Sequence, residues 1–238
     1  MSSIPPIYYQ IIMNILPLRF CISYFLLALI GLAAMTINPI PVTGSDTYLD
    51  FSISQDAPAL PASGLTAFIN QVATTGDTSQ LAGIYQYGTM RFPVVQQPKS
   101  APGFVSSQDD AVTQFRLAGE YGTTALLAHN YLAGKTFSRV NPGSILTVVY
   151  GNGTTQDYRV DEIREYRALT PNSPYSKFVN LADTDGPVLT STDLFFDIYK
   201  SNGRLVLQTC IEKDGQLSWG RLFILATPVY PYELVLYQ

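Results

Sequence analysis

Two pairs of strand-like segments, each joined by a polar turn, constrain the fold more than any other feature of this sequence. The first pair is SILTVVY and DYRVDEIREY, Ser144–Tyr150 and Asp157–Tyr166, on either side of GNGTTQ. Its Asn-Gly dipeptide is a strong hairpin signal, because both residues tolerate the positive φ angles of a two-residue turn. The second pair, RLVLQTC and GRLFILATPV, begins at Arg204 and Gly220 and is joined by IEKDGQLSW. The sequence therefore predicts two β-hairpins.

Shorter segments of the same kind precede the hairpins. ALLAH, Ala125–His129, is apolar up to its last residue and predicts a buried strand. MRFPVVQ, Met90–Gln96, is rich in β-branched residues, and its proline suits an edge or first strand because proline cannot donate to a neighbouring strand.

Helical patterns are few. They are LTAFINQVA from Leu65, DDAVTQFRLA after a cap position at Asp109 or Asp110, and STDLFFDIYKS with Ser191 as its cap. Many short strands with one or two short helices favour a mainly β protein that forms a closed or nearly closed β-barrel.

Composition limits the compartment and the partners. The 238 residues are 47% hydrophobic and 13% charged, which is enough to bury one full core. Of the 14 Lys and Arg residues only Arg19 lies within the first 37, and all 18 Asp and Glu residues follow that stretch. An acidic body without a basic cluster argues against nucleic acid as a partner.

The N-terminus is predicted to be a membrane segment. Phe20–Ile37 holds 18 uncharged residues, nearly enough for a helix to span the hydrocarbon core. Arg19 just before it favours an N-terminus inside and everything after Ile37 outside. The alternative is a signal peptide cleaved near Gly31-Leu32-Ala33, after which the protein would be secreted. In either case the rest of the chain is expected to be exported.

Three regions are expected along the chain. Residues 1–37 form the membrane anchor or signal segment, residues 38–64 an extended tether rich in Pro, Ser and Thr, and residues 65–238 the folded domain.

The chain has two cysteines and one histidine. Cys21 lies inside the apolar run and cannot reach an exported domain, so Cys210 is expected to stay reduced. A cysteine nucleophile needs a base or cation nearby and a partner for the oxyanion it creates. His129 and Cys210 both close apolar strands, and Arg221 opens the strand that follows the Cys210 hairpin. If those strands are neighbours, the three side chains meet at one end of the sheet.

These pieces resemble the sortases, exported cysteine transpeptidases with an eight-stranded β-barrel. The resemblance lies in AHNYLAG (Ala128–Gly134), LQTC (Leu207–Cys210) and RLFILA (Arg221–Ala226), and it covers roughly Met90–Val229. The family pattern before the cysteine is Thr-Leu-any-Thr-Cys, and this chain has Val206 in place of the first threonine. The implied fold is a sortase-like eight-stranded β-barrel preceded by an N-terminal transmembrane helix.

The resemblance implies a role for each residue. Cys210 would attack a peptide bond in a sorting motif of an exported protein, His129 would act as general acid and base, and Arg221 would hold the carbonyl oxygen. Thr209 and Asn130 flank these residues and are expected to support them, while Trp219 either shields the site from water or caps the barrel.

Partners and specificity follow from the same resemblance. An amine on a wall precursor or a pilin would accept the acyl group, at the outer face of the plasma membrane. The segment Ala168–Gly203 would form a wall of the substrate groove, although most of its aromatic residues are expected in the core. LPASG, Leu60–Gly64, looks like a sorting motif, but a chance match in a Pro/Ser-rich tether explains it more simply.

No cofactor is expected. Zinc is disfavoured because one histidine and one available cysteine leave no local ligand spacing. Calcium would be sought at Asp183 and Asp185 in LADTDG, where solvated loop acids are the commoner explanation.

Two other classes remain open. A cysteine peptidase would use the same three residues and transfer to water, and a non-catalytic exported β-barrel binding module would keep the fold without thiol reactivity. L,D-transpeptidases also pair His with Cys, but their arginine falls within a couple of residues of the cysteine, where this chain has Ile211 and Glu212.

Overall fold

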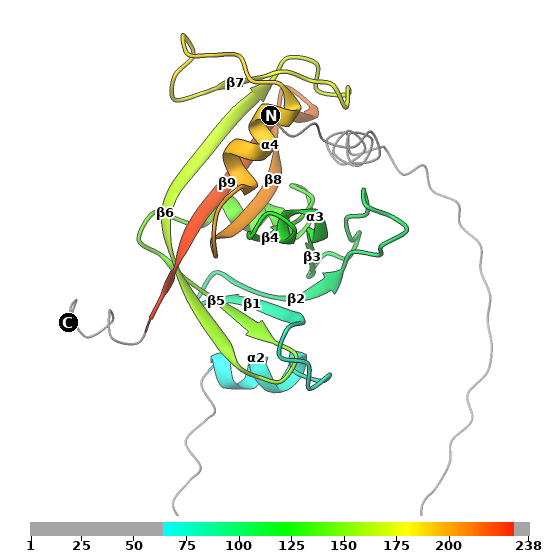
Figure 1. Cartoon of the computed structure of the whole chain (residues 1–238), viewed down its shortest axis with the longest axis vertical. Helices are drawn as coiled ribbons and strands as arrows, with labels where there is room; N and C mark the ends of the chain where they lie inside the picture. The colour runs from blue at the N-terminus through cyan, green and yellow to red at the C-terminus, as the bar shows by residue number, and fades with distance from the viewer. Residues whose placement is uncertain (1–63, 231–238) are drawn as a thin grey trace, which may run out of the picture. The chain divides into compact units, whose positions relative to one another are not determined.

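Both predicted hairpins form. The computed structural model describes residues 64–230 (Figure 1). Strand β5 (Ile145–Tyr150) turns through Asn152-Gly153 into β6 (Thr155–Ala168), and β8 (Leu205–Lys213) turns into β9 (Gln216–Val229). Both turns use positive φ angles, with Gly153 at 86° and Asp214 and Gly215 at 53° and 79°. The predicted membrane segment Phe20–Ile37, Cys21 and residues 38–63 of the predicted tether lie outside the described residues.

The strands close into a barrel. Their order is β5-β1-β2-β3-β4-β8-β9-β6, and a further pairing of β5 with β6 closes the ring of eight, while β7 pairs with the last residues of β6, Tyr166–Ala168. The β2–β3 and β4–β8 pairs are parallel, and the others are antiparallel. The predicted closed barrel is therefore confirmed for this part of the chain. The remaining strands are β1 (Leu81–Gln86), β2 (Met90–Gln96), β3 (Val112–Gln114), β4 (Thr124–Leu127) and β7 (Phe178–Asn180).

Two apolar clusters lie on opposite faces of this sheet. The first receives side chains from all eight ring strands, among them Ile84, Leu126 and Leu207, and fills the barrel. The second lies outside the barrel, where β4, β6, β8 and β9 pack against α4 and β7. Because side chains alternate along a strand, each residue of β8 or β9 belongs to one face or the other.

Helix α4 (Ser191–Tyr199) covers the outer face and runs beside β8 and β9 (Figure 1). The helix was predicted with Ser191 as its cap, and the cap is Thr190 instead. The Thr190 hydroxyl accepts from the Asp193 amide, and the Asp193 carboxylate accepts from the Thr190 amide. Ser191 is buried as the first helical residue.

The helix predicted over Asp109–Ala118 is wrong. Val112–Gln114 form β3, and only Arg116–Gly119 are helical, as α3. Val112 and Thr113 are fully buried between β2 and β4, and strand pairing on both sides overrides a weak local helical pattern.

The expectation that β2 is an edge or first strand is also wrong, since β2 lies between β1 and β3. The proline still lies at a position where its missing N–H interrupts the strand pairing least. Pro93 is the last residue paired with β1, and pairing with β3 begins at Val94. The strand changes partner at the proline.

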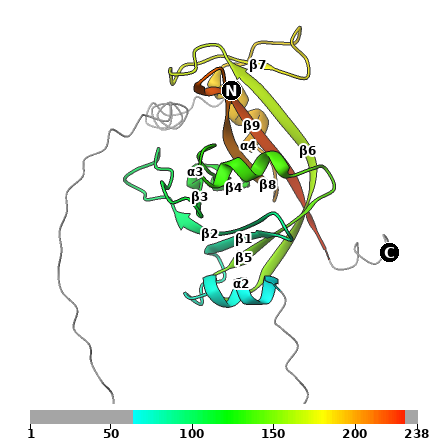
Figure 2. The ribbon, with the colours of Figure 1, turned by 180° about the vertical axis from the view of Figure 1, so that it is seen from behind.

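Two further helices complete the described chain. Helix α2 (Gly64–Val72), predicted from Leu65, lies under β1 (Figure 2). Its Phe68 ring packs against Gly83, where any side chain would collide. The 3-10 helix η1 (Ala133–Arg139) was not predicted. Between residues 64 and 230 no helix is long and apolar enough to cross a membrane.

Candidate functional site

Cys210 and Arg221 face each other across the β8–β9 hairpin. They are register partners in this antiparallel pair, and such partners project from the same side of a sheet with Cβ atoms about 5 Å apart. The side is the outer one, because Val206 and Phe223, at even spacing from them, belong to the outer cluster. Cys210 is a free cysteine and only 7% exposed.

His129 lies on the other side of Cys210. Leu127 at the end of β4 is in register with Gln208, and the pairing continues through the Ala128 amide, which donates to the Gln208 carbonyl at 3.1 Å. Ala128 faces the barrel interior, so His129 faces outward like Leu127. His129, Cys210 and Arg221 thus form one row across β4, β8 and β9 on the outer face, called here the Cys–His–Arg row.

The imidazole of His129 is half-buried and held from two sides. Its ring stacks on Tyr131, with centroids 5.2 Å apart and planes inclined by 28°. Burial lowers the pKa of His129 below its ordinary value, and a hydrogen bond with the backbone of Val105 partly opposes that shift. Its Nδ1 atom is buried and has no hydrogen-bond partner in the described chain. The environment favours the neutral ring, the form that can accept a proton.

Arg221 is 1% exposed, which is unusual for a guanidinium. Its Nη1 donates to the carbonyls of Ser218 and Gly220 at 3.0 and 2.8 Å, and its guanidinium lies over the Phe178 ring at 5.9 Å. These contacts fix the plane of a permanent positive charge beside Cys210. A cation held there stabilises a thiolate or an oxyanion.

Thr209 and Asn130 hold the row together. The Thr209 hydroxyl donates to the Ala128 carbonyl at 2.9 Å, joining β8 to the end of β4. The Asn130 side chain donates to the Leu217 carbonyl at 3.0 Å and so reaches β9, the strand beyond β8. Gly134 packs so closely that a Cβ there would lie 2.4 Å from the Thr209 hydroxyl and 2.6 Å from the His129 carbonyl.

Trp219 lies two residues before Arg221 on β9 and is half-buried, with the Lys213 ammonium 4.9 Å from its ring. Alternation along β9 places it on the outer face with Arg221. The position suits a shield at the edge of the row better than a cap inside the barrel.

The segment Ala168–Gly203 contributes to the outer cluster. Phe178, Phe195 and Tyr199 are buried in it, as expected for most of its aromatic residues, whereas Tyr175 is exposed. Its loop reaches the β8–β9 hairpin through Asn172, whose side chain accepts from Gln216 and Ser218.

No metal-binding group is formed by the described residues, in the sense of three or more His, Cys, Asp or Glu side chains gathered together. Asp183 and Asp185 are both exposed in the loop after β7.

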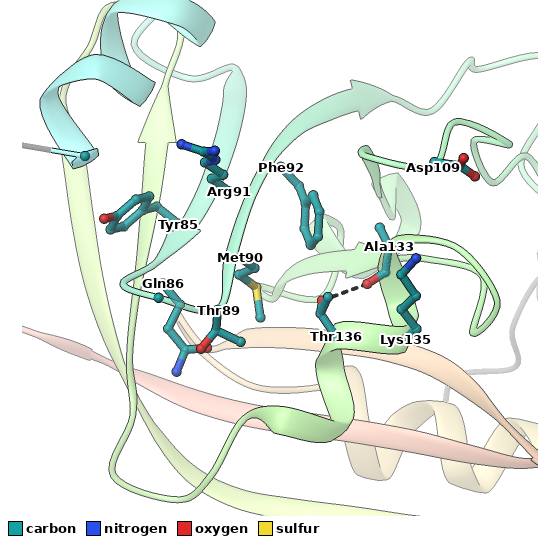
Figure 3. Close-up of a pocket in the computed structure, with 12 residues that line it drawn as sticks. Tyr85, Gln86, Thr89, Met90, Arg91, Phe92, Asp109, Ala133, Lys135 and Thr136 are labelled. Carbon is teal, nitrogen blue, oxygen red and sulfur yellow. Dashed lines mark hydrogen bonds between the residues drawn. The ribbon is translucent and has the colours of Figure 1, made fainter.

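A cavity of about 510 Å³ lies away from the row, between the β1–β2 hairpin and η1 (Figure 3). Met90, Phe92 and Ala133 line it, and these residues belong to or pack on the interior cluster. The Cys–His–Arg row lies on the other face of the sheet and does not line this cavity. The row is identified by strand register, and this cavity takes no part in it.

Two contacts of the row were not predicted from the sequence. Val105 comes from a loop 24 residues before His129, and no sequence pattern pairs them. The sequence does show an aromatic residue, Tyr131, two positions after the only histidine, but no local pattern predicts that the two rings stack.

The described chain is thus a closed eight-stranded barrel with a cysteine on β8, an arginine on β9 and a histidine just after the end of β4, all in one row. Solved sortase structures are similar to it at low identity. Sortase C-1 from Actinomyces oris is 15% identical, with 79% of this chain and 90% of that chain covered and a TM-score of 0.44. Sortase C1 from Streptococcus suis is 14% identical, with 70% and 80% covered and a TM-score of 0.42. Listeria monocytogenes sortase A is 12% identical, with 63% and 88% covered and a TM-score of 0.38.

No protein-family model and no curated protein matches the chain. The roles assigned to the row below therefore rest on its geometry and on the motifs around each residue.

Proposed function

We propose that this protein is a sortase-like cysteine transpeptidase that joins a sorting-motif peptide of an exported protein to an amine. The observation that supports the proposal is the Cys–His–Arg row, in which the free Cys210 lies between His129, whose pKa is lowered by burial, and the buried guanidinium of Arg221. Cys210 and Arg221 are 11 positions apart in the sequence and His129 lies 81 positions before Cys210, yet the three share one face of neighbouring strands, and they are residue types that acyl transfer through a thiol uses.

The chemistry proceeds in two halves. In the first, His129 takes the thiol proton as the Cys210 sulfur attacks the peptide carbonyl carbon, and the negative oxygen is held by Arg221. The C–N bond then breaks, His129 protonates the leaving amine, and a thioester on Cys210 remains. In the second half an acceptor amine attacks the thioester, gives a proton to His129 and releases the thiolate. No cofactor takes part.

The position of the enzyme belongs to the same proposal. Phe20–Ile37 would anchor the chain in the plasma membrane with the barrel outside, or would direct its secretion. The donor is an exported protein, and the acceptor is an amine of a wall precursor or a pilin. The segment Ala168–Gly203, which borders the row at Phe178, would contribute to the choice of peptide.

The test begins with thiol reactivity, which requires no knowledge of the sorting motif. In a Cys21→Ser background Cys210 is the only thiol. We expect iodoacetamide to alkylate it near neutral pH, and His129→Asn to slow the reaction at least tenfold. A Cys210 that labels slowly and independently of His129 would favour the non-catalytic binding module.

The second step detects transfer. The full chain in detergent micelles is incubated with a pool of Leu-Pro-any-Thr-Gly peptides, with and without hydroxylamine, and the products are weighed by mass spectrometry. We expect an acyl adduct on Cys210 and a hydroxamate product, both absent from Cys210→Ala and strongly reduced in Arg221→Lys. Product that is a free acid regardless of added amine identifies a peptidase that transfers to water.

A further inference from the structure

We propose that Tyr131 is a positioning residue for His129, whose ring holds the imidazole against the end of β4 and keeps water from one of its faces. The inference deepens the proposed function and rests on it for the role of His129. The contact itself does not depend on any activity.

The Tyr131 ring lies against one face of the His129 imidazole. The two rings lie nearly parallel, 28° apart, at a centroid separation of 5.2 Å, which places the Tyr131 ring over a face of the imidazole. Tyr131 is 53% exposed, so one face of its ring meets solvent while it covers the histidine. The Tyr131 hydroxyl makes no hydrogen bond among residues 64–230, so the side chain acts on His129 through its aromatic ring.

His129 has few other constraints. The strand β4 ends at Leu127, and the backbone after it is held by Asn130 and by the amides of Leu132 and Gly134, which both donate to the His129 carbonyl. These bonds fix the backbone of His129 but leave its side-chain torsions open. The ring itself stacks on Tyr131, and the backbone of Val105 acts on its pKa.

The contact with Tyr131 also affects the protonation of the His129 imidazole. Nδ1 is buried without a partner in the described chain, so a proton placed there would have no acceptor. Strand register puts two ionisable side chains on the same face as the imidazole, Cys210 on β8 and Arg221 beyond it on β9, and Tyr131 stacks on the ring. A covered imidazole remains neutral over a wider pH range and is therefore ready to accept the thiol proton.

An opposite effect has to be weighed. An aromatic face attracts a cation by roughly 0.5–1 kcal/mol at exposed sites, which would favour the protonated ring. Since burial is the largest influence on the pKa of His129 and acts downward, we expect water exclusion to outweigh this attraction. The two effects predict opposite shifts when the Tyr131 ring is removed.

The first experiment uses the fact that the chain has one histidine. The full chain, purified in detergent micelles with a histidine-free tag and labelled with ¹³C,¹⁵N-histidine, gives a single Hε1–Cε1 resonance whose pH titration belongs to His129. For Tyr131→Ala we expect the midpoint to rise towards 6.5, the ordinary value of histidine. Tyr131→Phe, which keeps the ring, should titrate like the parent.

A matched control is Tyr87→Ala. Tyr87 lies in the β1–β2 turn and is 88% exposed, so its loss removes an equally large ring away from the row. We expect no change in the His129 titration for this variant. A Tyr131→Ala midpoint that stays at the parent value or falls would overturn the proposal.

The second experiment measures the effect of the Tyr131→Ala substitution on kcat and KM. In Tyr131→Ala we expect kcat to fall roughly tenfold to a hundredfold, as misplacement of a reacting group typically does, with KM nearly unchanged. The acid limb of the kcat/KM profile should move to higher pH together with the NMR midpoint, and Tyr131→Phe should restore both.

The two experiments separate the two hypotheses. If the parent shows no transfer activity but the NMR midpoint rises in Tyr131→Ala, the proposed function fails and the positioning contact stands. If the parent is active and Tyr131→Ala matches it in kcat and pH profile, the function stands and the role of Tyr131 is rejected.

Discussion

A single glycine decides whether the end of β4 can approach β8. Gly134 at the start of η1 lies against the Thr209 hydroxyl and the His129 carbonyl, and its own amide donates to that carbonyl at 3.0 Å. Any β-carbon at this position would occupy the space of two row-supporting groups, one of which is backbone and cannot rotate away. Gly134 therefore constrains the position of the row, although it is not one of the three reactive residues.

We expect Gly134→Ala to lower both stability and activity. The new methyl would lie 2.4 Å from the Thr209 hydroxyl and 2.6 Å from the His129 carbonyl, so the segment carrying His129 must move outward. Overpacking of this kind costs about 1–3 kcal/mol. Thermal unfolding measures the first effect and alkylation of Cys210 the second.

The control is Gly119→Ala at the end of α3, where nothing lies within 4 Å of an added β-carbon. It should leave the melting temperature and the alkylation rate within error of the parent. Gly134→Ala behaving in the same way would show that η1 can shift without disturbing the row.

His129 also links stability to pH. Its pKa is lowered in the folded state, so the unfolded chain takes up a proton near pH 6.5 that the folded chain refuses. Its contribution to stability is therefore fully present above pH 6.5 and is lost as pH falls through that value towards the folded pKa. Below the folded pKa the loss no longer grows.

Urea unfolding between pH 4.5 and 7.5 tests this dependence. The difference between the parent and His129→Asn isolates the histidine, because carboxylates such as Asp193, whose pKa is lowered by its bonds to Thr190, contribute equally to both. We expect the parent to lose more stability than the variant as the pH falls. Parallel curves would show that the imidazole is as well solvated folded as unfolded.

At the scale of elements, helix α4 covers the outer apolar cluster on the face of the sheet that also carries the row. Its buried residues Leu194, Phe195 and Ile198 pack on β8 and β9, and Tyr199 donates a short hydrogen bond to Gln208, two residues before Cys210. On its exposed side Asp197 pairs with Arg164 at 3.1 Å and accepts from the Tyr166 hydroxyl. The helix thus covers the face of β8 from which Cys210 projects.

The first turn of α4 depends on its capping box. Thr190→Ala removes the hydroxyl that accepts from the Asp193 amide at 3.2 Å, and we expect a loss of about 1 kcal/mol in the free energy of unfolding. Chemical denaturation measures it. Thr184→Ala, an exposed loop threonine in the same connection, is the control and should be neutral. Equal stability of the two variants would mean that packing alone holds the helix start.

At the scale of the whole barrel, the strand pairings are uneven. β6 and β9 pair along Asp157–Arg167, whereas β3 is only three residues long and pairs with β4 only at Thr113 and Gln114. The ring is therefore weakest on both sides of β3, where Pro93 also precedes the change of partner on β2. Local opening is expected to start there.

Hydrogen exchange followed by mass spectrometry tests this expectation on the full chain. Peptides covering β3 should exchange well before those of β8 and β9, because fewer ladder bonds must break to expose their amides. A β3 peptide protected as strongly as β9 would show that the barrel opens only as a unit. Strands β8 and β9, which carry Cys210 and Arg221, lie at the protected side of this gradient, whereas β4 borders β3.

Much of the fold could be predicted from local pattern. The hairpins around Asn152-Gly153 and Asp214-Gly215 and the buried strand before His129 follow from alternation and turn chemistry. The helix predicted from Asp109 failed because burial of Val112 between two strands outweighs its local preference. Helix η1 was missed because the apolar spacing of AGKTFSR is too short to signal a helix.

The sequence by itself determined which residues can react and predicted six of the nine described strands, β2, β4, β5, β6, β8 and β9, because side-chain chemistry, alternation and turn preference are local properties. It placed Cys210 and Arg221 near each other, since a hairpin connects them. Only the tertiary structure decided that β4 lies parallel to β8, joined by the Thr209–Ala128 hydrogen bond across 81 residues of sequence. It also decided that Tyr131 covers the imidazole. Both depend on long-range packing, whose free energy is gained only when the whole barrel closes, so no local pattern encodes them.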